Sequence, residues 1–358
     1  MKTLFKISVS LLLSLSLLFS CSKENRPETV FEGRVLVINQ GNYTEHSASL
    51  SLYDEESGQI TNRVYETANG ISIGATIISG VLTPDKEAAL ICNYPDKILY
   101  IDPLTAEDKN KTITEGLASP RCMVITEDYT YVTNWDYTHT VTDQGVWEFT
   151  DSYIAIYSNS THTLLGKVAA GTDAEGIYLY GNRLFVAVKE GIAVFNIQGN
   201  TVVRTNLITV PGVSNGAKYI VADAYQKLWI SFAGEGVAQI DPATLSLFSF
   251  TEVPVDSMDG YIAADPGGQN IYTYNTVFNA QYMPESAAVY KVNVKNRAIT
   301  PIFSGEYFYS IGVSPYTGNI YTAEVSFTSN SLVKVFSPSG EIKKSVTAGV
   351  GTSRYIFF

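Results

Sequence analysis

The chain of 358 residues carries 24 basic and 35 acidic residues, which gives a net charge of −11. A chain this acidic repels nucleic acid and anionic lipid, so neither is an expected partner. Charged residues make up 16% of the chain and aromatic residues 12%, a balance typical of a β-rich extracytoplasmic domain and not of a disordered or cytosolic helical protein.

The first 20 residues have the pattern of a signal peptide. Lys2 and Lys6 precede the apolar residues 7–19, a run too short to span a bilayer as a mature helix. The Leu-Phe-Ser sequence before Cys21 resembles a bacterial lipobox, which implies cleavage and lipidation at Cys21. The alternative is an ordinary signal peptide with an incidental cysteine. The polar residues 21–32 are interpreted as a flexible tether to a single domain over residues 33–358.

A repeated unit of four short strands organises the rest of the chain. It is clearest in residues 174–203, where Ile177–Tyr180, Arg183–Val188 and residues 192–197 alternate and are separated by Gly and Asn turns. The third strand recurs seven times as an alternating run that ends in an apolar residue before a turn. These final apolar residues are Tyr53, Ile101, Tyr157, Phe195, Ile240, Val292 and Phe336. Their spacing of 38 to 56 residues predicts an all-β, seven-bladed β-propeller.

The two ends of the domain predict how the ring closes. The first repeat starts at Gly33 with a second-strand pattern, RVLVIN, and no first strand precedes it. The chain ends in TSRYIFF, whose Arg354 is placed like Arg121 at the start of the third blade. We therefore expect the C-terminal strand to become the innermost strand of the first blade, which removes free sheet edges.

One face of the predicted propeller carries the long connections, notably residues 135–152 and 276–286. Long loops in a compact repeat are more often functional than ornamental. The connections are rich in aromatic residues: Tyr43, Tyr94, Trp135, Tyr137, Trp147, Phe149, Phe278, Tyr282, Tyr307, Phe308 and Phe327. Exposed aromatic rings offer flat contact area for a partner. The alternative is that they pack the loops onto the propeller body.

Polar residues at two recurring positions are candidate ligand contacts. The ends of the second strands carry Asn39, Asn93, Asn134, Asn275 and Glu324, which we expect to ring the mouth of the central channel. Such a ring suits a neutral ligand rich in amides or hydroxyls. The alternative is that Asn serves the turn itself. Near the blade starts, Arg121, Lys218 and Arg354 are candidate contacts for a phosphate, against the alternative of solvated surface charge.

Catalytic motifs are largely missing from the sequence. The three histidines, His46, His139 and His162, lack metal-site spacing, and no nucleophile elbow or nucleotide-binding loop is found. We expect neither enzymatic activity nor a metal or cofactor. Cys92 and Cys122 are compatible with a disulfide or with buried free thiols.

The opening VLVINQGNYTEHSASLSLYDEESGQI resembles the first blade of the YncE-like seven-bladed propeller lipoproteins of Bacteroidetes, which include the cobalamin-binding BtuG group. Lys23 and Glu24 resemble the surface-export signal of such lipoproteins. The resemblance implies a lipid-anchored protein at the surface of the outer membrane. It also implies capture of cobalamin or a related corrinoid as a bound ligand, and transfer to an outer-membrane TonB-dependent B12 transporter. A glycan- or protein-binding propeller is the alternative, and a propeller lactonase or lyase is a third.

Overall fold

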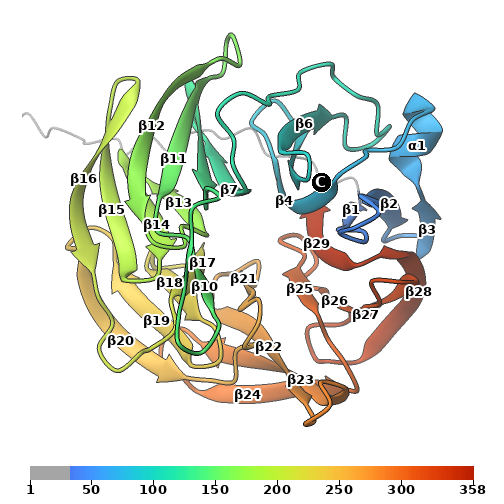
Figure 1. Ribbon diagram of the computed structural model, residues 1–358. Helices are drawn as coiled ribbons and strands as arrows, with labels where there is room; N and C mark the ends of the chain where they lie inside the picture. Colours follow the sequence, from blue (N-terminus) through green and yellow to red (C-terminus); the bar gives the residue numbers. More distant parts are fainter. Residues whose placement is uncertain (1–32) are drawn as a thin grey trace, which may run out of the picture. The chain divides into compact units, whose positions relative to one another are not determined.

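The computed structural model describes residues 33–358, so the predicted signal segment, Cys21 and the tether lie outside the described residues. Seven antiparallel sheets, six with four strands and one with three, follow one another around a ring (Figure 1). This confirms the prediction of an all-β, seven-bladed propeller. No helix in the described part of the chain is long and apolar enough to cross a membrane.

Within each blade the strands are given from the inside of the ring outwards. Blade 1 contains β29 (Thr352–Phe357), β1 (Arg34–Asn39), β2 (Ser49–Asp54) and β3 (Gln59–Asn62). Blade 2 contains β4 (Thr76–Leu82), β5 (Ala88–Asn93) and β6 (Lys97–Ile101). Blade 3 contains β7 (Pro120–Ile125), β8 (Tyr129–Asn134), β11 (Ser152–Ser158) and β12 (Leu164–Gly171). Blade 4 contains β13 (Ile177–Tyr180), β14 (Arg183–Val188), β15 (Gly191–Gln198) and β16 (Thr201–Ile208).

The remaining blades follow the same plan. Blade 5 contains β17 (Ala217–Ala222), β18 (Leu228–Phe232), β19 (Gly236–Asp241) and β20 (Ser246–Glu252). Blade 6 contains β21 (Ile262–Ala264), β22 (Asn270–Phe278), β23 (Pro284–Asn293) and β24 (Ile299–Gly305). Blade 7 contains β25 (Ser310–Val313), β26 (Ile320–Glu324), β27 (Asn330–Phe336) and β28 (Ile342–Val350). Two elements lie outside this plan: helix α1 (Val64–Asn69), and the small hairpin of β9 (Thr140–Val141) and β10 (Trp147–Glu148).

Middle strands are buried on both faces because each blade packs between two neighbours. In β14, Leu184 and Val186 join the core shared with blade 3, whereas Phe185 and Ala187 join the core shared with blade 5. Alternate side chains of a strand point to opposite faces, so a strand in this position needs an almost continuous apolar run. Each fully buried aliphatic or aromatic side chain contributes about 1.5–3 kcal/mol relative to exposure.

The ring closes as predicted, by antiparallel pairing of β29 with β1. Ile356 lies opposite Leu36 and Arg354 lies opposite Ile38. Ile356 is only 5% exposed and packs into the same core as Leu36. This closure places Arg354 on the innermost strand of blade 1.

The two described cysteines are free thiols, which favours that interpretation over a disulfide. Cys92 is fully buried in the core between blades 1 and 2. Burial raises the pKa of the Cys92 thiol to about 12, so the group stays protonated and behaves as a small apolar side chain.

Candidate functional site

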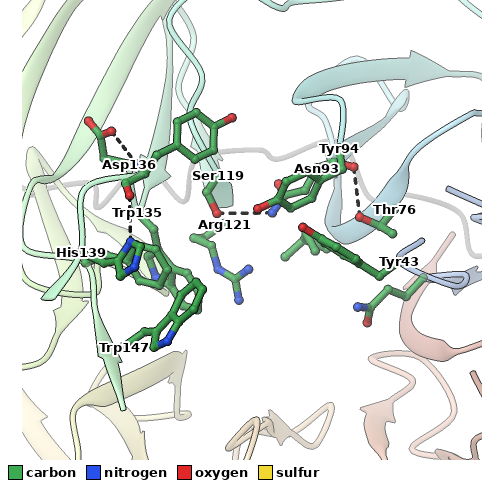
Figure 2. Close-up of a pocket in the computed structure, with 14 residues that line it drawn as sticks. Tyr43, Thr76, Asn93, Tyr94, Ser119, Arg121, Trp135, Asp136, His139 and Trp147 are labelled. Atoms are coloured by element: carbon green, nitrogen blue, oxygen red, sulfur yellow. Dashed lines mark hydrogen bonds between the residues drawn. The ribbon is translucent and has the colours of Figure 1, made fainter. Parts of the chain in front are cut away.

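A cavity of about 380 Å³ opens on the face that carries the long connections, above blades 1, 2 and 3. Seven of its lining residues have rings: Tyr43, Tyr94, Trp135, Tyr137, His139, Trp147 and Phe149. We call this cavity the aromatic cleft. Figure 2 shows Tyr43 and Tyr94 on one side of the opening, Trp135, His139 and Trp147 on the other, and Arg121 between them. Six aromatic residues predicted from three separate connections are thus brought together.

Two tyrosines form the first wall. Their ring centroids lie 4.6 Å apart in an edge-to-face arrangement, with Tyr43 on the β1–β2 connection and Tyr94 directly after β5. A hydrogen bond with Tyr43, together with burial, raises the pKa of Tyr94 to about 12, so the Tyr94 phenol is neutral at physiological pH. The loop that carries Tyr43 requires glycine at position 41. A Cβ on Gly41 would lie 2.3 Å from the backbone nitrogen of Ala48, and its φ is +84°.

The insertion between β8 and β11 builds the second wall. Trp135 stacks on Phe149 with ring centroids 4.7 Å apart, and His139 stacks on Trp147 at 4.4 Å with an interplanar angle of 9°. Pairing of β9 with β10 sets Trp147 opposite Val141, which holds the two halves of the insertion together. The phenol of Tyr137 donates a hydrogen bond to Asp96 of blade 2 and so ties the insertion to the neighbouring blade.

Arg121 lies between the walls, on the innermost strand of blade 3. Its Cζ atom is 3.8 Å from the centroid of the Trp135 ring, and its Nε donates to Glu175 Oε1 at 3.0 Å. The Glu175 side chain is only 2% exposed, and it also accepts a hydrogen bond from Tyr219 at 3.3 Å. The positive charge of Arg121 is therefore compensated within the protein, and its contribution to the cleft is a flat cationic face against the indole.

A second arginine, Arg354, lies on the innermost strand of blade 1. The guanidinium of Arg354 is 3.4 Å from the ring centroid of Tyr261 and 4.8 Å from that of Tyr219. Nearby, burial raises the pKa of Asp259 to about 6, although the positive charge of Arg354 acts in the opposite direction. Arg354 does not line the aromatic cleft, and its role in ligand binding stays a prediction.

The expected ring of amides at the channel mouth does not form. Asn39 and Asn134 are fully buried, so the prediction that they line the mouth is wrong. Asn39 donates to Ser51 Oγ at 2.9 Å, and Asn134 accepts a hydrogen bond from the backbone N–H of residue 118 at 3.0 Å. Both amides stabilise the strand ends and the connections beside them. Asn93 lines the aromatic cleft, Asn275 is half-buried, and Glu324 forms an ion pair with Lys334.

The aromatic residues predicted on blades 6 and 7 lie outside the cleft. Phe278 contacts Tyr307 with centroids 6.1 Å apart, Phe327 contacts Tyr309 at 5.3 Å, and Tyr282 is 87% exposed between β22 and β23. Phe308 is 1% exposed and belongs to the core of blades 6 and 7, which corrects its assignment to the set of exposed loop aromatics. A role of Phe278, Tyr282 and Phe327 in ligand binding stays a prediction, because none of the three lines the cleft and a ligand held inside it would not contact them.

Sequence reasoning missed three residues that shape the site. Glu175, Asp96 and His139 orient Arg121, Tyr137 and Trp147 respectively. A comparison of the blade starts would have found Glu175, which lies two residues before β13, near the start of its blade as Arg121, the second residue of β7, is near the start of blade 3. Nothing in the sequence singles out Asp96 or the stacking role of His139.

Comparisons with known proteins agree with this fold. A family model described as "Domain of unknown function (DUF5074)" matches residues 33–352. No curated protein matches the sequence.

Solved structures with the same architecture share little sequence with this chain. A protein from Bacteroides uniformis described as a candidate 6-phosphogluconolactonase is 13% identical, with 91% of this chain and 99% of that chain covered and a TM-score of 0.66. A quinoprotein alcohol dehydrogenase-like protein from Bacteroides thetaiotaomicron is 14% identical, with 91% and 78% covered and a TM-score of 0.63. The periplasmic gluconolactonase PpgL of Pseudomonas aeruginosa is 13% identical, with 90% and 98% covered and a TM-score of 0.60. At such identities the likeness shows the fold alone.

Proposed function

The chain belongs to the DUF5074 family, and from the aromatic cleft of this member we propose that it is a non-catalytic protein that captures a polar, ring-bearing ligand outside the cytoplasm. The observation that carries the proposal is the pair of facing aromatic walls. Tyr43 is 54% exposed and Trp147 is 59% exposed at the rim of the cleft. Large exposed rings grouped around a cavity favour a binding site, because a bound ligand would remove their apolar area from water.

The ligand class that we favour is a corrinoid such as cobalamin. A corrinoid is a wide disc whose rim carries amides and, in cobalamin, a phosphate. Flat aromatic faces would contact the disc, while the partly exposed Gln40 and Asp136 offer polar contacts to its rim. A disc of that size exceeds a cavity of about 380 Å³, so it would enter the cleft by one edge and extend onto the neighbouring surface. The sequence resemblance to cobalamin-binding propellers supports the same choice.

A glycan is the second candidate. The size of the cleft, about 380 Å³, suits one or two sugar rings better than a complete corrinoid. Sugars commonly stack on exposed aromatic faces, and the cleft adds hydrogen-bonding groups at Asp136 and Ser119.

The cellular setting belongs to the proposal as well. Lipidation at Cys21 would anchor the protein in the outer membrane and leave the propeller at the cell surface. A ligand held at the open face of the ring would then be passed to an outer-membrane TonB-dependent transporter. Both statements rest on the lipobox and family resemblances in the sequence.

The experiment is a calorimetric titration of the purified propeller with cyanocobalamin, run beside a glycan array. Trp147→Ala tests the cleft, and Tyr282→Ala is the matched control, since Tyr282 is exposed on the same face but outside the cleft. Saturable binding that Trp147→Ala weakens and Tyr282→Ala preserves supports corrinoid capture. Glycan binding with the same pattern supports the second candidate. The proposed function would be contradicted if neither cyanocobalamin nor a glycan binds, or if Trp147→Ala leaves the affinity unchanged.

A further inference from the structure

A second and larger cavity lies on the other side of the β9–β10 hairpin. Its volume is about 720 Å³, and Trp135, Trp147 and Phe149 line it as well as the aromatic cleft. These three side chains are therefore a shared wall. A ligand that stacks on one side of this wall has a polar cavity directly beyond it, lined among others by Asn215 and Lys218.

Lys218 differs from Arg121 and Lys189 at this face because no carboxylate within residues 33–358 forms an ion pair with its ammonium. Arg121 pairs with Glu175, Lys189 pairs with Glu148, and Arg354 stacks on tyrosine rings. Among residues 33–358, the ammonium of Lys218 forms neither an ion pair nor a hydrogen bond in the structure. Its Nζ atom lies 5.8 Å from the ring centroid of Trp135, next to the shared wall, and the side chain is half-buried.

The carboxylates of this cavity are already engaged. Glu148 is neutralised by Lys189. Asp173 accepts a hydrogen bond from the backbone N–H of Phe149 at 2.7 Å. Burial raises the pKa of Asp173, and the positive charges of Lys218 and Lys189 act in the opposite direction. The ammonium of Lys218 thus faces a cavity in which one carboxylate is paired with Lys189 and the other accepts a backbone hydrogen bond, and it has three donors to offer a ligand.

We propose that the cavity lined by Lys218 binds the phosphate or carboxylate group of the ligand whose ring lies in the aromatic cleft. The inference rests on the proposed function in so far as it assigns both cavities to one ligand. It narrows the ligand to molecules that carry an anionic group a short distance from a flat ring system. Lys218 is a specificity residue in this account, since it separates anionic from neutral ligands of the same ring type.

The anion site can be tested without knowing the ligand. Tryptophan fluorescence is followed while inorganic phosphate, or in a second arm acetate, replaces chloride at constant ionic strength. The proteins are the native chain, Lys218→Gln, and Lys295→Gln, which removes an equal charge from a third-to-fourth strand connection on the opposite face. We expect a saturable change with phosphate, acetate or both in the native protein and in Lys295→Gln, and none in Lys218→Gln. No saturable change with either anion, or an equal change in Lys218→Gln, would overturn the anion site.

The link between the two cavities is tested with a pair of corrinoids. Cyanocobalamin carries a phosphodiester, whereas dicyanocobinamide has the same ring without it. We expect Lys218→Gln to weaken cyanocobalamin binding by about tenfold, the size of a charge-assisted hydrogen bond, and to leave cobinamide binding unchanged. Equal effects on both corrinoids, or none, would contradict the link. If neither corrinoid binds the native protein, the corrinoid proposal fails, while the phosphate and acetate titrations still decide the anion site.

Discussion

Arg121, in the first strand of blade 3, pairs with Glu175, two residues before the first strand of blade 4: Arg121 Nη2 lies 3.0 Å from Glu175 Oε1, and the two side chains are 15% and 2% exposed. The same guanidinium contacts the indole of Trp135, so one ion pair connects the centre of the ring to the wall of the cleft. Glu175 does not itself line the cleft, but it holds the guanidinium that packs against the wall.

The first prediction concerns this pair. Glu175→Ala leaves the charge of Arg121 nearly buried and unpaired, which we expect to lower the free energy of unfolding by about 3 kcal/mol. Urea unfolding measures the loss. Glu341→Gln, at an exposed position, is the control and should change the free energy of unfolding by less than about 0.5 kcal/mol. Equal stability of Glu175→Ala and the native protein would show that the pair carries no structural role.

The second prediction separates the two tryptophans of the insertion. Trp147 is 59% exposed, so Trp147→Ala should reduce ligand affinity by about 1–3 kcal/mol with little change in melting temperature. Trp135 packs against both Phe149 and Arg121, so Trp135→Ala should lower affinity and stability together. Calorimetric titration and thermal unfolding distinguish the two effects. Unchanged affinity in both variants would place the binding site elsewhere.

The repeat and the closure could be predicted because each depends on local pattern. Residues 192–195 are a continuous apolar run, which reflects burial on both faces of a strand. The pairing of β29 with β1 followed from a missing strand at one end and a surplus strand at the other. Helix α1 was not predicted, since it is only one and a half turns long and its stability comes from buried Tyr65, whose hydroxyl donates to Asp108.

The candidate site was predicted only in part, because an aromatic residue in a loop carries no signal for the direction of its side chain. Tyr43, Tyr94 and Trp147 converge because blades 1, 2 and 3 are neighbours, whereas Phe278 and Tyr282 come from blade 6. The prediction for the strand-end asparagines Asn39 and Asn134 was wrong for a related reason. Aligning the repeats gives the position of each asparagine along its strand. Whether its amide points to the centre of the ring or to the adjoining connection depends on how the neighbouring strands and loops pack.

The third prediction tests the closure. Deletion of residues 353–358 removes most of the innermost strand of blade 1 and exposes the edge of β1, so we expect the cooperative unfolding transition to disappear. Ile356→Ala is a less disruptive variant because it keeps the strand. It should lower the free energy of unfolding by about 2–4 kcal/mol through the cavity that it leaves. Thermal unfolding monitored by circular dichroism reports both. A soluble truncated protein with the native melting curve would refute the closure as a requirement for folding.

The fourth prediction concerns pH. Burial raises the pKa of Asp259 to about 6 in the folded protein, whereas an aspartate in an unfolded chain has a pKa of about 3.9. The folded state therefore binds more protons between these two values, and the contribution of this group to stability falls as pH rises from about 4 to about 6. Asp259→Asn should lessen that fall in urea unfolding experiments, while the exposed Asp85→Asn should not. If the free energy of unfolding depends on pH in the same way for Asp259→Asn and the native protein, the pKa of Asp259 is not raised in the folded state.

Oxidative footprinting with and without cyanocobalamin, read out by mass spectrometry at single residues, tests most directly that the aromatic cleft is the binding site. The account predicts that Trp147 and Tyr43, each more than half exposed in the free protein, lose reactivity when the ligand is present, while Tyr282 stays fully reactive. Unchanged reactivity of Trp147 and Tyr43 under saturating ligand, with protection at other residues, would contradict it.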